Sequence, residues 1–128
     1  MILTFTTILL VDDDPMIRSL GKELLEHLGY RVLTARDGDE AVAGYQAQEL
    51  VDLVILDFHL PGQSGLAVLE NLRAMDPDSR VLMASGYFSP QETCRIREEG
   101  ASGLLLKPFR VGELQNRIRQ ALAGVSGW

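Results

Sequence analysis

The chain has 128 residues, a length typical of one domain and too short for two. Its hydrophobic share of 46% and charged share of 23% match soluble globular proteins and exclude disordered and fibrous classes. A formal net charge of −6 argues against direct binding to nucleic acid, and the single Cys94 excludes an internal disulfide or a cysteine metal site. We therefore expect a packed cytoplasmic protein.

The first predicted element is a strand over residues 8–11. The apolar segment around it lacks a positively charged start and is interrupted by residues 12–14, so neither a signal peptide nor a membrane span is expected. Asp14 and Pro15 predict the start of a helix, because aspartate caps helices and proline suits the first turn. Gly29 predicts its end. The apolar face of this helix comprises Ile17, Leu20, Leu24 and Leu28.

The rest of the chain repeats this alternation of strand and helix. Further short apolar runs predict strands at residues 32–35, 53–56, 81–84 and 104–106. Apolar residues at helical spacing follow at Leu66, Leu69 and Leu72, and again at Val111, Leu114, Ile118 and Leu122. A capping box at residues 89–92 predicts the start of the fourth helix.

Five β-α units predict an α/β fold with a doubly wound, five-stranded parallel sheet, covered by helices on both faces. We expect one domain over residues 1–128 with a core at about residues 7–123. Residues 1–6 and 124–128 are predicted to be dispensable.

Ligands of an open parallel sheet bind beyond the carboxyl ends of its strands, so the polar residues that follow each apolar run are the candidate site. They are Asp12, Asp13, Asp57, Ser85 and Lys107. Close carboxylates repel each other by roughly 4 kcal/mol per pair at about 4 Å and an effective dielectric near 20, which a dication would relieve. Oxygen ligands without His or Cys favour Mg²⁺.

The same set suits phosphoryl transfer. An ionised aspartate attacks phosphorus without a general base. An ammonium group such as that of Lys107 neutralises the charge on the phosphoryl oxygens, and the Ser85 hydroxyl donates a hydrogen bond to one of them.

Four motifs make the chain resemble the response-regulator receiver (CheY-like) family from Ile8 to about Ala123. They are Ile8-Leu9-Leu10-Val11-Asp12-Asp13-Asp14, Ile55-Leu56-Asp57 with Leu60-Pro61-Gly62, Ala84-Ser85-Gly86, and Leu106-Lys107-Pro108-Phe109. The resemblance implies a flavodoxin-like sheet in the strand order 2-1-3-4-5. The Ala84-Ser85-Gly86-Tyr87 stretch resembles receivers attached to hybrid histidine kinases.

The resemblance also implies a role for each site residue. Asp57 is then the phosphoacceptor, Ser85 the switch hydroxyl and Lys107 the phosphoryl-binding base. Asp12 and Asp13 are the metal acids. The backbone carbonyl of His59 is a further metal ligand, and Lys107-Pro108 is a cis peptide.

The implied function is two-component phosphorelay signalling. Asp57 accepts a phosphoryl group, with Mg²⁺, from the phosphohistidine of a histidine kinase or phosphotransfer protein. Phosphorylation switches the face formed by the fourth helix, fifth strand and fifth helix toward a downstream target that the sequence does not identify. No membrane or direct nucleic-acid partner is expected, and no turnover of an external substrate.

Three features depart from this pattern or leave it open. Leu104 stands where the family usually carries an aromatic residue that reports phosphorylation, and Tyr87 is the nearest aromatic that could replace it. His59 occupies a position that influences the lifetime of the phosphoryl group. The fourth helix, over residues 90–99, has few apolar side chains besides Ile96 and Cys94, so we expect it to be the loosest helix, with Cys94 at least half-buried.

Two other functions fit parts of the sequence. Asp12 and Asp14 form the D-x-D pattern of haloacid-dehalogenase-type enzymes, with Asp12 as nucleophile and Asp14 as acid, although the chain is short for that family. A docking module that works without phosphorylation is the third possibility, which Leu104 favours.

Overall fold

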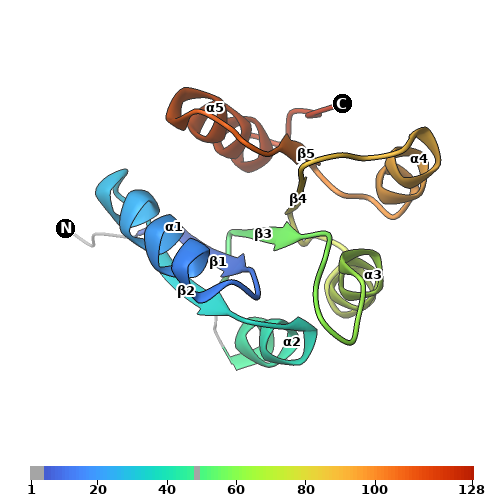
Figure 1. Cartoon of the computed structure of the whole chain (residues 1–128), viewed down its shortest axis with the longest axis horizontal. Coiled ribbons are helices and arrows are strands. Elements are labelled where there is room, and N and C mark those ends of the chain that lie inside the picture. The colour runs from blue at the N-terminus through green and yellow to red at the C-terminus, as the bar shows by residue number, and fades with distance from the viewer. Residues whose placement is uncertain (1–4, 48–49) are drawn as a thin grey trace.

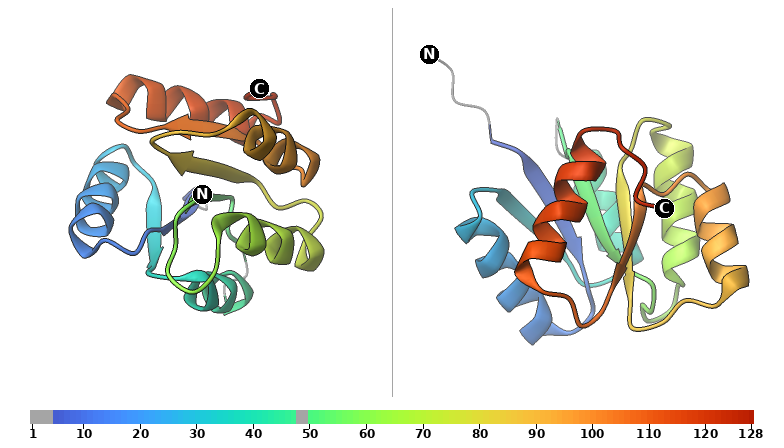
Figure 2. Two further views of the ribbon diagram at one scale, coloured as in Figure 1. Left: turned by 45° about the vertical axis from the view of Figure 1, so that its right-hand side comes forward. Right: turned by 90° about the horizontal axis from the view of Figure 1, so that it is seen from above.

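The computed structural model describes residues 5–47 and 50–128, which form a five-stranded parallel sheet in the order β2-β1-β3-β4-β5 (Figure 1). The strands all run in one direction, and Figure 2 shows the helices on either side of the sheet. The strands are β1 Thr7–Val11, β2 Arg31–Ala35, β3 Leu53–Asp57, β4 Val81–Ser85 and β5 Gly103–Leu106. The helices are α1 Pro15–His27, α2 Gly38–Ala47, α3 Gly65–Met75, α4 Pro90–Glu98 and α5 Val111–Leu122. The predicted fold class and strand order are confirmed.

Successive side chains of the central strands point to opposite faces of the sheet and pack in two separate cores, one on each face. On β3, Val54 and Leu56 pack in the core beneath α2, α3 and α4, whereas Leu53 and Ile55 pack in the core beneath α1 and α5. Figure 1 shows the same division of the helices. Burial on both faces explains why these strands are continuous apolar runs rather than alternating ones.

The predicted helix boundaries are confirmed by their hydrogen bonds. The Asp14 carboxylate accepts from the N–H groups of Met16 and Ile17 and so caps α1. Ser89 and Glu92 form the capping box of α4. Gly29, which follows α1, has a φ of +99°, a conformation that favours glycine.

The first half of the predicted apolar face of α1 is not buried against the sheet. Ile17 and Leu20 are 43% and 60% exposed, and Met16 beside them is also exposed. Gly21 faces the sheet instead, where an added Cβ would lie 2.6 Å from a side-chain carbon of Leu10. The helix therefore carries an apolar stripe that this chain leaves open to solvent.

One further expectation is corrected. Cys94 is exposed on α4, whose one buried residue is Ile96. Residues 124–128 lie against the sheet, because Gly127 forms an isolated parallel bridge with Gly103 of β5, and their being dispensable stays a prediction. At the other terminus, residues 1–4 lie outside the described residues, and Phe5 is exposed. Within residues 5–47 and 50–128, no helix has the length and apolar character needed to cross a bilayer.

Candidate functional site

The parallel register brings the polar ends of the central strands to one edge of the sheet. Val11 pairs with Leu56, so the residues that follow them, Asp12 and Asp57, end up on adjacent strands. Asp57 in turn pairs with Ala84 of β4. The sequence predicts this convergence because every strand runs in the same direction.

Three carboxylates form a compact group, here called the acid pocket: Asp12, Asp13 and Asp57. One oxygen from each lies within 4.8 Å of the others. Asp12 and Asp57 are buried, whereas Asp13 is exposed. Oxygen atoms alone, at this spacing, fit a hard divalent cation such as Mg²⁺, so the pocket could bind a metal.

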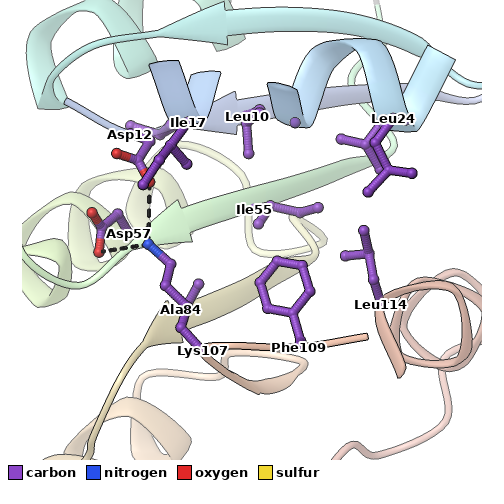
Figure 3. A pocket seen from close by; sticks show the side chains of 13 residues that line it. Leu10, Asp12, Ile17, Leu24, Ile55, Asp57, Ala84, Lys107, Phe109 and Leu114 are labelled. Atoms are coloured by element: carbon purple, nitrogen blue, oxygen red, sulfur yellow. Dashed lines mark hydrogen bonds and ion pairs between the residues drawn. The ribbon is translucent and has the colours of Figure 1, made fainter. Parts of the chain in front are cut away.

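Lys107 supplies the one cation drawn at the pocket in Figure 3, where its ammonium group points between two of the acids. Its Nζ lies 3.2 Å from Asp12 Oδ2 and 3.8 Å from Asp57 Oδ1. The lysine follows β5 directly, and its N–H donates to the Ser85 carbonyl at 2.8 Å. The Lys107-Pro108 peptide is cis, as the resemblance implies.

Burial raises the pKa of the Asp57 carboxyl above its usual range. The N–H of His59 and the ammonium of Lys107 lower it, and the charges of Asp12 and Asp13 raise it further. The net upward direction means that the lysine does not fully offset desolvation and repulsion. A dication among these oxygens would favour the ionised carboxylate.

Backbone donors fix the orientation of both buried acids. The N–H of Asp14 donates to Asp12 Oδ1 at 3.0 Å, and the N–H of His59 donates to Asp57 Oδ1 at 3.2 Å. Asp14 itself caps α1, so its carboxylate is occupied away from the pocket. This argues against the dehalogenase-type mechanism, in which Asp14 would act as the acid.

The His59 side chain is exposed, and its site contact is the backbone N–H, a donor that side-chain patterns do not reveal. Its carbonyl as a metal ligand stays a prediction.

Ser85 lies buried at the end of β4, beside the residue that pairs with Asp57. Its hydroxyl donates to the Tyr87 carbonyl at 3.0 Å and accepts from the Tyr87 N–H at 3.3 Å. The hydroxyl is therefore engaged by its own loop rather than by the acids. The Tyr87 ring is exposed, and whether it takes the place of the aromatic residue that position 104 lacks stays a prediction.

An aromatic contact beside the pocket was not predicted from the sequence. The rings of Phe58 and Phe88 meet edge to face, with centroids 5.6 Å apart. Phe58 directly follows Asp57, and Phe88 precedes the capping box of α4. The two rings thus connect the strand that carries the central acid with the start of α4.

A small apolar cavity adjoins the acid pocket between α1 and α5. It has a volume of about 60 Å³, and Figure 3 shows Phe109, Leu24 and Leu114 around it, to the right of Asp12 and Asp57. Ile17 of the exposed stripe lines its outer side. The cavity could not be predicted from the sequence, because it depends on how α1 and α5 pack across the sheet.

Comparison with known proteins identifies the family. Residues 8–119 match the response regulator receiver domain. The probable transcriptional regulatory protein TcrX of Mycobacterium tuberculosis is 34% identical over 91% of this chain and 49% of its own length. The transcriptional regulatory protein CpxR of Klebsiella pneumoniae is 41% identical over 90% of this chain and 48% of its own length. The chain thus spans about half the length of these curated relatives.

Solved structures agree with this match. The chemotaxis protein CheY4 of Vibrio cholerae superposes with a TM-score of 0.88 and 30% identity, over 93% of this chain and all of that one. The response regulator TrrA of Thermotoga maritima, solved in complex with Mg²⁺ and BeF, gives a TM-score of 0.83 and 34% identity, over 92% of this chain and all of that one. The chain therefore belongs to the response-regulator receiver family of two-component signalling.

Proposed function

We propose that Asp57 accepts a phosphoryl group, in a Mg²⁺-dependent reaction, from the phosphohistidine of a histidine kinase or phosphotransfer protein. The observation that carries this proposal is the position of Asp57. It is a buried acid held between two further carboxylates and the Lys107 ammonium, at the carboxyl edge of a parallel sheet. The complex of TrrA with Mg²⁺ and BeF supports the same site by similarity.

The residues that would hold the metal are Asp12, Asp13, Asp57 and the backbone carbonyl of His59. When bound, Mg²⁺ supplies neutralisation of the charge on the transferring phosphoryl oxygens and on the crowded carboxylates. Asp12 is fixed for this role by the N–H of Asp14, and its carbonyl accepts from the Arg18 guanidinium at 2.8 Å.

In the proposed transfer, a carboxylate oxygen of Asp57 bonds to phosphorus as the bond from phosphorus to the donor nitrogen breaks. The electron pair of the broken bond stays on the donor histidine. The His59 N–H holds the attacking carboxylate in position. Lys107 lies close enough to form an ion pair with the phosphoryl oxygens. The Ser85 hydroxyl then exchanges the Tyr87 carbonyl for a phosphoryl oxygen.

The rearrangement of Ser85 gives a route to the face formed by α4, β5 and α5. Ser85 and Tyr87 lie in the segment that leads from β4 into α4, so a changed hydrogen bond there acts on the start of that helix. We propose that this face binds the downstream target. No turnover of an external substrate is expected, because the phosphoryl group is accepted by the protein itself.

The exposed stripe of α1 is suited to bind the phosphodonor. Met16, Ile17 and Leu20 are exposed apolar residues on the helix that begins directly after Asp12 and Asp13. A partner that covers this stripe would gain apolar burial and would also approach the open side of the acid pocket. Substituting Leu20 by Ser should slow transfer from a protein donor and leave transfer from acetyl phosphate unchanged.

The decisive experiment follows phosphoryl incorporation from acetyl phosphate and from a phosphohistidine protein, with and without Mg²⁺. The unmodified chain should be labelled only with the metal, and Asp57→Asn should not be labelled at all. Asp39→Asn is the matched control, because Asp39 is an exposed acid in the first turn of α2, outside the pocket. Full labelling of Asp57→Asn would refute the assignment.

Lys107→Ala separates metal binding from the response to phosphorylation. The acids that hold the metal remain, so Mg²⁺ binding measured by calorimetry should persist. The amide shifts that beryllofluoride causes should shrink, because the ammonium that follows the phosphoryl charge is gone. Loss of Mg²⁺ binding with a normal beryllofluoride response would contradict the role of Lys107.

One observation favours a second candidate, a docking module that works without phosphorylation. Leu104 stands where the family usually carries an aromatic residue, and it is partly buried against the core beneath α3 and α4. Unchanged amide spectra on addition of Mg²⁺ and beryllofluoride would favour this alternative.

A further inference from the structure

The chain does not leave the edge of the sheet open at β5. Residues 124–128, here called the strap, turn back after α5 and lie beside β5 (Figure 2). The Gly127 N–H donates to the Ser102 carbonyl at 3.0 Å, on the side of β5 opposite to β4. An edge strand offers unpaired backbone groups to other chains, and the strap occupies the first of them here.

Backbone and side-chain contacts with both flanking helices hold the strap in place. On the α5 side, the Arg117 guanidinium donates to the Gly127 carbonyl at 2.7 Å, and the Val125 N–H donates to the Gln120 carbonyl at 2.9 Å. On the α4 side, the Arg97 guanidinium lies over the Trp128 ring, 5.9 Å from its centroid. The strap therefore links the two helices on either side of β5.

The Trp128 ring is anchored rather than free. Its indole N–H donates to the Ala101 carbonyl at 3.1 Å, and the residue is only 37% exposed. Ala101 lies between α4 and β5, so this bond ties the strap to the connection that positions α4.

Two glycines make the close approach possible. A Cβ on Gly103 would lie 3.0 Å from the Cα of Gly127, and a Cβ on Gly127 would lie 3.0 Å from the Ser102 carbonyl oxygen. These contacts are with backbone atoms, which cannot move aside as a flexible side chain would. Glycine at positions 103 and 127 therefore allows the strap to pack directly against β5.

The helix that the strap reaches is weakly held otherwise. Ile96 is the single buried residue of α4, whereas α5 buries Leu114, Ile118 and Ala121. The contacts through Arg97 and the Ala101 connection therefore add to a helix that has one buried side chain of its own.

We propose that the strap is an intramolecular inhibitor of the α4-β5-α5 face: it covers the start of β5, restrains α4, and leaves when α4 shifts. This inference rests on the proposed function for its link to phosphorylation, but the restraint of α4 by the strap does not depend on that link. Release of the strap would free the Ser102 carbonyl and widen the groove that Leu104 and Leu106 line together with Trp128, so that a partner could enter it.

The restraint is tested on the full chain with Gly103→Ala, which should lift the strap. Trp128 is the sole tryptophan, so its fluorescence reports the strap directly. We expect stronger quenching by acrylamide and faster amide exchange in α4 than in the parent. Gly112→Ala is the matched control, because a Cβ there meets no atom within 4 Å. Stronger quenching with unchanged exchange in α4 would overturn the restraint.

A second variant approaches the strap from α4. Arg97→Ala should also raise quenching of Trp128 and speed exchange in α4, whereas Arg119→Ala on α5 should change neither. Should Gly103→Ala fail to fold, this pair decides the question. Equal quenching in Arg97→Ala and the parent would overturn the proposed hold on Trp128.

The link to phosphorylation is tested by adding Mg²⁺ and beryllofluoride to the parent chain. We expect quenching of Trp128 to rise together with amide shifts around Asp57. Shifts at Asp57 with no change at Trp128 would overturn the inhibitory role of the strap and leave the proposed function intact. Absence of shifts at Asp57 would count against the proposed function, and the two variant comparisons would still decide whether the strap restrains α4.

Discussion

The bodies of the central strands and their carboxyl ends have opposite surroundings. In β3, Leu53 to Leu56 are buried between the two cores, and each removes apolar surface from water. One residue later, Asp57 is also buried, but it lies beside two other carboxylates. Burial raises its pKa. Adjacent residues thus contribute to the free energy of unfolding with opposite signs. The buried apolar side chains of the strand stabilise the fold, whereas the acid pocket destabilises it because its acids are placed for function.

Leu56→Ala gives the sharpest contrast with Asp57→Asn. Leu56 is fully buried in the core under α3, so the truncation should lower the free energy of unfolding by about 2–5 kcal/mol. Asp57→Asn should not lower it, because an unfavourable buried charge is removed. Urea denaturation of both variants without Mg²⁺ measures the difference. A larger loss for Asp57→Asn than for Leu56→Ala would reverse the comparison.

Asp13→Asn should relieve part of the repulsion while keeping the shape of the pocket. Asp13 is exposed, so its interaction with the other acids is screened by water, and we expect a gain of about 1 kcal/mol in the metal-free protein. Saturating Mg²⁺ should raise the melting temperature of the parent more than that of the variant.

Differential scanning calorimetry at matched ionic strength checks the Asp13→Asn prediction, because salt alone weakens the repulsion. Asp39→Asn again serves as the control for loss of one exposed charge. Equal gains from Mg²⁺ in Asp13→Asn and the parent would show that Asp13 is not a metal ligand.

The destabilising charge of Asp57 should also appear in the pH dependence of the free energy of unfolding. Burial raises the pKa of Asp57 in the folded protein, so the folded state binds this proton more tightly than the unfolded chain does. Above the folded pKa the ionised carboxylate lowers stability, and this penalty vanishes as pH falls toward the unfolded value near 3.9. The stability advantage of metal-free Asp57→Asn over the parent should therefore shrink on acidification. An advantage that grew at low pH would contradict this sign.

The smallest expected effect concerns α4, a helix that buries few side chains against the sheet. Its amides should exchange faster than those of α5, because Ile96 alone is buried there. Beryllofluoride with Mg²⁺ should speed that exchange further, because release of the strap removes a restraint on α4. Equal protection of α4 and α5 in both states would remove this part of the comparison.

Features set by local sequence and strand direction could be predicted from the sequence. The strand bodies were predicted to within one residue at each end, because burial on both faces demands a continuous apolar run that few other structures need. The helix starts at Asp14 and Ser89 were also predicted, since capping depends on local hydrogen bonds. Asp12, Asp57 and Lys107 converge as expected from strand direction alone.

The features that sequence missed depend on packing between distant segments. Helical spacing marks which residues of α1 share a face but not whether another element covers that face, so the exposure of Ile17 and Leu20 could not be predicted. Cys94 was misplaced for the same reason. The position of the strap beside β5 was not predicted either, because it depends on the close approach of Gly127 to Gly103, which are 24 residues apart.

The ion pair between Lys107 and Asp12 joins residues 95 positions apart, and it has a consequence for synthesis on the ribosome. A nascent chain that has released β1 and β3 already contains all three acids, but it lacks the cation that lies between two of them. Until β5 emerges, the buried charges of Asp12 and Asp57 have only backbone donors to oppose their repulsion. The acid pocket should therefore close late, after nearly the whole sheet is available, so that a truncated chain is a poor phosphoryl acceptor.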